Sequence, residues 1–157
     1  MGTLAGVAFS GARFCFKTHM PVSYRILVDL GLVYVRYTGT VSVSERSALF
    51  KDYLQHPDCR PGQKHFVDLS QITDVKTDHA AGMRFQALKA EYYIGPVQTM
   101  VVYFAPTLMG QTLAEFAIRS WDNHSGLVAR VFDTQSAALN FLGVTSKEFE
   151  QLLSQTD

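Results

Sequence analysis

The sequence lacks the features that would place it across a membrane, in a disulfide-stabilised scaffold or on nucleic acid. No run of about 18 apolar residues occurs, so no transmembrane helix is predicted. The two cysteines, Cys15 and Cys59, are too few for a disulfide framework and lack the paired spacing of a zinc site. Fourteen basic and fourteen acidic residues cancel, so no nucleic-acid partner is expected. Free thiols are typical of a reducing compartment, which favours a cytoplasmic protein.

Patterns of catalytic and cofactor-binding residues are also missing. The five histidines are scattered and form no H-x-x-x-H or H-x-H pair, and no glycine-rich phosphate loop occurs, so we expect no metal and no cofactor. Asp68, Ser70 and His79 have the residue types of a hydrolytic triad, but the G-x-S-x-G motif that would expose such a serine is absent. We therefore predict that the protein is not an enzyme.

The remaining composition is that of one globular domain. Of the 157 residues, 47% are hydrophobic and 18% are charged, which is enough to bury a continuous core. Residues 1–19 differ, because they contain Arg13 and Lys17 but no acidic residue. They are interpreted as an extension before a true start at Met20, as a disordered tail or extra strand, or as a targeting peptide. Residues 20–157 are predicted to form the single domain.

Hydrophobic periodicity and turn residues predict alternating strands and helices after an initial hairpin. Ser42 and Glu45, and later Thr145 and Glu148, have capping-box spacing, and each pair marks the start of a helix. The expected strands are 24–29, 32–38, 65–69, 98–105 and 128–132, and the expected helices follow Ser42, begin near Thr77, span 108–122, follow Thr134 and follow Thr145. This order predicts an α/β fold with a mixed, mainly parallel sheet and packed helices.

Several local motifs resemble one family of small bacterial proteins. They are the Val-Asp-Leu-Ser run at 67–70, an Ile-Thr-Asp turn at 72–74, Ala-Pro at 105–106 and a Ser-Ala-Ala-Leu-x-Phe-Leu helix at 136–142. Over residues 22–143 the chain resembles the SpoIIAA-like family of STAS domains. The resemblance implies a STAS-like fold and a regulatory or binding role, and it links the chain to CRAL-TRIO-type lipid-binding folds.

The same resemblance raises the alternative of a phospho-regulated switch. Anti-sigma-factor antagonists of this kind carry a phosphorylatable serine in an Asp-Ser-Ser-Gly-like motif at the start of the second helix. Here that region reads Asp74-Val75-Lys76-Thr77-Asp78, and the glycine is displaced to Gly82. Thr77 or Ser70 could accept a phosphate beside a helix N-terminus. Alternatively, Thr77 or Asp74 caps the helix and its polar neighbours, including Asp68, Thr73, Asp78 and His79, are turn residues at the carboxyl end of a strand.

The helix at 108–122 is more apolar than packing on a sheet requires. At 100° per residue its apolar positions cover an arc of about 200°, whereas a sheet-packed helix needs a stripe somewhat above 100°. The surplus flank contains Ala114, Ile118 and Trp121. It could pack on the second helix, which has spare apolar residues in Met83, Tyr93 and Ile94, or it could cover an apolar ligand, a membrane surface or a second subunit.

From these observations we predict a non-enzymatic binding or regulatory module. Its second and third helices would engage an apolar small molecule, a protein partner, a second copy of the chain in a homodimer, or a membrane surface peripherally. The residues expected to form this apolar surface are Met83, Phe85, Tyr92, Met109, Phe116, Ile118 and Trp121.

Overall fold

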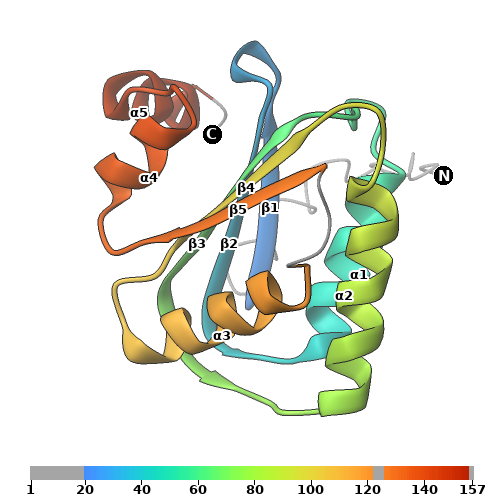
Figure 1. Cartoon of the computed structure of the whole chain (residues 1–157). Coiled ribbons are helices and arrows are strands. Elements are labelled where there is room, and N and C mark those ends of the chain that lie inside the picture. The colour runs from blue at the N-terminus through green and yellow to red at the C-terminus, as the bar shows by residue number, and fades with distance from the viewer. Residues whose placement is uncertain (1–19, 122–125, 156–157) are drawn as a thin grey trace, which may run out of the picture.

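The computed structural model describes residues 20–121 and 126–155, and they form one five-stranded sheet with helices on both faces (Figure 1). The strands are β1 (Val22–Leu27), β2 (Leu32–Val41), β3 (Lys64–Val75), β4 (Thr99–Phe104) and β5 (Leu127–Phe132), and they lie in sequence order across the sheet. β1 is antiparallel to β2, and the other three pairings are parallel. The prediction of a mixed, mainly parallel sheet is confirmed. The segment 1–19 lies outside the described residues.

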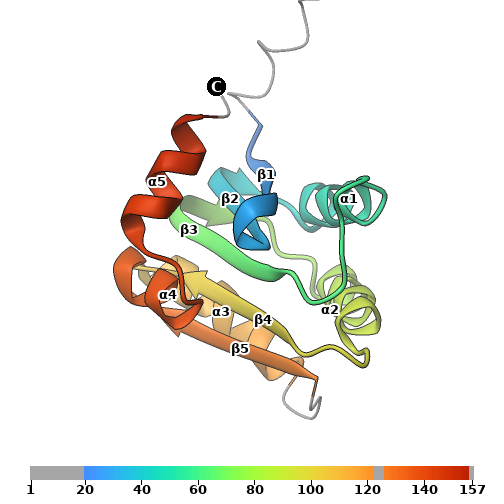
Figure 2. The same ribbon diagram turned by 90° about the horizontal axis from the view of Figure 1, so that it is seen from above.

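The helices lie in two groups on opposite faces of the sheet (Figure 2). α1 (Val43–Leu54), α2 (His79–Tyr93) and α3 (Leu108–Arg119) each connect two parallel strands and pack on one face. α4 (Gln135–Phe141) and α5 (Ser146–Ser154) follow the last strand and pack on the other. The five predicted helical segments are all present, and α3 ends at Arg119, three positions before the predicted end.

Local capping interactions explain where the helices begin. The Ser42 and Glu45 side chains each accept a hydrogen bond from the other residue's backbone N–H, and Thr145 and Glu148 do the same, so both predicted capping boxes are confirmed. α2 begins differently. Asp78, and neither Thr77 nor Asp74, is its N-cap, because the Asp78 carboxylate accepts from the backbone N–H of Ala81 at 3.0 Å.

β3 is longer than its apolar run predicted. The Ile-Thr-Asp segment, predicted as a turn, continues the strand, because it pairs with the carboxyl end of β2 through Thr40↔Asp74 and Val41↔Val75. Ile72 is 4% exposed and contributes to the core, which holds this extension in the sheet. As a result, the loop from β3 to α2 lies beside the start of α1.

Two hydrophobic cores hold the helices against the sheet. The core under α1, α2 and α3 is rich in aromatic side chains, whereas α4 and α5 bury Phe66, Leu139 and Phe149 on the opposite face. The residues of the first core include Phe50, Tyr53, Phe85, Tyr93, Tyr103 and Trp121. α3 approaches the strands closely at Gly110, where a Cβ atom would lie 3.2 Å from the Leu69 Cβ and 3.3 Å from the Ala105 Cβ. This close approach fixes the position of the first turn of α3.

Candidate functional site: a cleft between α2 and α3

A cleft of about 420 Å³ opens between the first turns of α2 and the body of α3, at the carboxyl end of β3. In Figure 1 this is the region where the loop after β3 enters α2, with α3 beside it. Its lining residues come from the start of α1 (Val43, Arg46), from 74–78, from α2 (His79, Gly82) and from α3 (Met109, Thr112, Leu113, Phe116). In open α/β sheets, this end of the parallel strands is the usual place for a ligand.

The cleft is mostly apolar. α2 and α3 lie close together at Gly82, where a Cβ atom would be in ordinary contact with the Phe116 ring, at 3.6 Å. The His79 ring lies tilted against the same ring, with 5.7 Å between the ring centres. Val43, Val75 and Leu113 complete the apolar surface. Such a surface favours a ligand with an apolar body and a few oriented polar groups.

Charged groups lie at two depths in the cleft. Asp74, Lys76 and Asp78 are exposed at its edge, and both carboxylates accept backbone N–H groups, from Val75 and Ala81 respectively. Arg46 is different, because it is only 6% exposed. Its Nε donates to the backbone oxygen of Ser42 at 3.4 Å, and its guanidinium lies 5.7 Å from the centre of the Phe85 ring. Within residues 20–121 and 126–155, no carboxylate forms an ion pair with it.

The structure brings together two groups of residues that the sequence had suggested separately. Met109 and Phe116, from the predicted apolar surface, line the same cleft as Thr77, the predicted phospho-acceptor. Met83 is 48% exposed but lies outside this lining. The other residues of the predicted apolar surface do not line the cleft: Phe85 is buried in the core, and Tyr92 and Ile118 are half-buried against it.

Trp121 belongs to the core and offers no free surface. It is 3% exposed, its indole N–H donates to the backbone oxygen of Gln86 at 3.3 Å, and its ring meets that of Tyr93 edge to face. The prediction had placed Trp121 on a helical face, but α3 ends at Arg119 and the chain then turns toward α2. At this end of α3 the surplus apolar surface is covered by ordinary packing between helices.

Asp68, Ser70 and His79, whose residue types match a hydrolytic triad, do not come together. Ser70 donates through its hydroxyl to Asp68 at 2.6 Å, and Asp68 also accepts from the hydroxyl of Tyr34 at 2.9 Å. Tyr34 packs against Phe149 of α5, which places this polar group on the α4–α5 face of the sheet. His79 lies in α2 on the other face, against Phe116. The serine and the histidine are therefore separated by the sheet. Thr77 is exposed, whereas Ser70 is half-buried.

A buried polar group beneath α2 was not predicted from the sequence. Lys89 is 6% exposed and His65 is 3% exposed. Burial, with a further contribution from the charge of Arg46, lowers the pKa of Lys89 to about 7. Burial and the nearby Lys89 lower the pKa of His65 to about 3. A small internal cavity of about 30 Å³ lies between α1, α2 and the sheet, and Arg46, Lys89 and His65 all line it.

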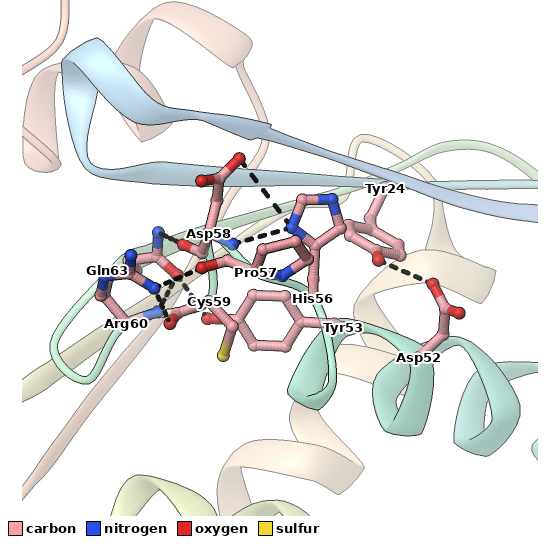
Figure 3. Close-up of polar contacts among 9 residues, drawn as sticks. All are labelled: Tyr24, Asp52, Tyr53, His56, Pro57, Asp58, Cys59, Arg60 and Gln63. Atoms are coloured by element: carbon pink, nitrogen blue, oxygen red, sulfur yellow. Dashed lines mark hydrogen bonds and ion pairs between the residues drawn. The ribbon is translucent and has the colours of Figure 1, made fainter.

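Polar contacts at the opposite end of the sheet fix the loop between α1 and β3 (Figure 3). The hydroxyl of Tyr53 donates to the Gln63 side-chain oxygen at 2.7 Å, and the Gln63 side-chain nitrogen donates to the backbone oxygen of Asp58 at 2.9 Å. The Cys59 sulfur lies 3.2 Å from the Tyr92 hydroxyl, which joins the loop to α2. His56 accepts the backbone N–H of Asp58. These contacts satisfy the loop's own polar atoms and have a structural role.

Two further features are absent from the part of the chain that the structure describes. No three histidine, cysteine or acidic side chains gather there in a way that could hold a metal ion. No helix in that part has the length and apolar character needed to cross a bilayer.

Compared with known proteins, the chain matches no family model and no curated protein. The likeness to the SpoIIAA-like family therefore rests on the sequence motifs alone.

Proposed function

We propose that this chain is a non-enzymatic binding module that takes an apolar small molecule in the cleft between α2 and α3. The observation that carries the proposal is an apolar cleft of about 420 Å³ at the carboxyl end of a parallel strand. This volume lies within the roughly 300–1,000 Å³ typical of small-molecule sites. A concave site of this kind suits a small molecule better than a flat membrane or a second subunit.

We also propose that the fold is of the STAS type and that the chain is a SpoIIAA-like protein of the cytoplasm. In support, the sheet begins with an antiparallel hairpin and continues with parallel strands connected by helices, which is the element order that the resemblance implies. The Cys59 thiol is free, in keeping with a reducing compartment.

A neutral fluorescent probe tests the proposed site. N-phenylnaphthylamine, which fluoresces in apolar surroundings, should bind the wild-type chain at one saturable site. Replacing Gly82 with Leu should reduce this binding strongly, because the new side chain would extend from α2 toward Phe116 and fill the cleft. Met83→Leu, one position along α2 but outside the cleft lining, is the matched control. Equal binding by both variants and the wild type would contradict the proposal.

A phospho-regulated switch is the second candidate, and one observation favours it. Thr77 is exposed at the edge of the cleft, one residue before the N-cap of α2, where a phosphate would meet the positive end of the helix. The adjacent Asp78 carboxylate would repel that phosphate. Incubation with kinases of the host, followed by mass mapping, should label Thr77 if this candidate is correct, and a protein without label at Thr77 or Ser70 would exclude it.

A further inference from the structure

We infer that the ligand of this cleft is an apolar carboxylate, and that Arg46 binds its acidic group. This inference rests on the proposed function and adds the chemical class of the ligand. It starts from the one charged group of the cleft lining that is buried: Arg46 is 6% exposed, whereas Asp74, Lys76 and Asp78 are exposed.

The hydrogen-bonding capacity of Arg46 is mostly unused. A guanidinium has five N–H donors arranged as a planar fork. In the described part of the chain, only Nε of Arg46 has an acceptor, the backbone oxygen of Ser42 at 3.4 Å. Among the described residues, Gln86 Oε1 is the one fully buried side-chain nitrogen or oxygen atom without a hydrogen-bond partner. The two Nη atoms of Arg46 also have no partner, so they are not fully buried. The Nη donors therefore keep some accessible surface, and Arg46 lines both the cleft and the small internal cavity.

The charge of Arg46 is also unbalanced. No carboxylate among the described residues forms an ion pair with it, and Lys89, the other cation lining the small internal cavity, adds positive potential. A largely buried cation without an ion-pair partner is unfavourable, so a bound anion would stabilise this arrangement. The two carboxylates at the edge of the cleft already accept backbone N–H groups and do not reach Arg46 within ion-pair distance.

The position of Arg46 determines how a ligand would lie. Arg46 lines both the cleft and the small internal cavity beneath α1 and α2, so it stands at the inner end of the cleft. Met109, Leu113 and Phe116 line the part formed by α3. A carboxylate bound by both Nη atoms would therefore be directed inward, and its apolar chain would extend along α3 toward the edge.

Dodecanoate and dodecanol separate this inference from the proposed function, because they share an apolar chain and differ in charge. Each is titrated against bound N-phenylnaphthylamine, below the micelle concentration of the acid. We expect wild-type protein to bind dodecanoate at least tenfold more tightly than dodecanol, since hydrogen bonds to a charged group are strong. Equal affinity of the wild type for both would overturn the role of Arg46 and leave the apolar site intact. Binding of neither compound nor the probe would remove the proposed function and this inference with it.

Variants assign the preference to Arg46. Arg46→Met keeps an unbranched side chain and should remove the preference, so that this variant binds dodecanoate and dodecanol with similar affinity. Arg46→Lys keeps the charge and should retain part of the preference. Lys76→Met removes an exposed cation from the edge of the same cleft and should preserve most of it. Circular dichroism checks that each variant folds. If Arg46→Met does not fold, the comparison of Arg46→Lys with Lys76→Met shows which cation gives the preference for dodecanoate. Loss of the preference in Lys76→Met with full retention in Arg46→Lys would overturn the assignment.

Discussion

The Nζ atom of Lys89 lies 4.7 Å from the centre of the Trp121 ring, so a lysine of α2 contacts the segment that follows α3. The same nitrogen lies 5.1 Å from the centre of the Phe85 ring and 3.5 Å from the hydroxyl of Tyr103. A cation above aromatic faces is stabilised by their negative charge density, but these contacts do not replace the lost hydration. Burial therefore lowers the pKa of Lys89 to about 7.

Replacing Lys89 with Met should stabilise the protein at neutral pH. In the unfolded chain the lysine keeps its ordinary pKa of 10.5, against about 7 in the folded chain. Between these values the unfolded state binds the extra proton, so wild-type stability rises with pH across this window and is lowest below it. Urea unfolding should show Lys89→Met more stable than wild type by about 2–4 kcal/mol near pH 7. This difference should shrink by about 2 kcal/mol near pH 9. A difference that does not change with pH would contradict the prediction.

His65 should make the fold sensitive to mild acid. Its pKa falls from 6.5 to about 3 on folding, so between these values only the unfolded state is protonated. Stability should therefore decrease as pH falls, by about 1.4 kcal/mol per pH unit from this group. In His65→Phe, which keeps a ring against Tyr53 and Tyr93, urea unfolding should lose this part of the pH dependence. His56→Asn changes a partly exposed histidine and serves as the control. If the free energy of unfolding of His65→Phe depends on pH as steeply as that of the wild type, His65 is not buried in its neutral form.

The two exposed methionines of α2 and α3 provide a matched test of the cleft. Met109 is 38% exposed and lines the cleft. Met83 is similarly exposed, at 48%, but does not line the cleft. Met109→Gln should weaken the binding of N-phenylnaphthylamine severalfold, because a polar amide would replace apolar contact area with the probe. Met83→Gln should leave the affinity unchanged. Fluorescence titration of both variants measures the difference, and a larger effect at Met83 would move the site away from the cleft.

The elements that the sequence predicted well are those whose signals are local. The capping pairs at Ser42 and Thr145 act within one helical turn, so their spacing is sufficient to locate a helix start. The buried strands were recognised by composition, although the length of β3 was not, because its last residues are held by pairing with β2.

The candidate site was only partly predictable because it depends on packing between helices. Met109, Phe116 and Thr77 were each identified, but their meeting in one cleft requires the close approach of α2 and α3 at Gly82. Arg46 and Lys89 were missed, since a cation on a helix usually points to solvent. Their spacing was a usable signal: Arg46 precedes the buried Phe50 by four residues, and Lys89 follows the buried Phe85 by four, so each lies on the inward face of its helix.

Two glycines in the first turns of neighbouring helices should respond in opposite ways to an added methyl group. Gly82→Ala should stabilise the protein by about 0.5–1 kcal/mol, because alanine restricts the unfolded chain. Its Cβ would meet Phe116 at an ordinary contact distance of 3.6 Å. Gly110→Ala should instead destabilise by about 1–3 kcal/mol, because its Cβ would lie 3.2 Å from Leu69 and 3.3 Å from Ala105, both in the packed core. Urea unfolding of the two variants measures both values. Stabilisation by Gly110→Ala would mean that α3 can move away from the sheet, and the packing of α3 that shapes the cleft would then have to be revised.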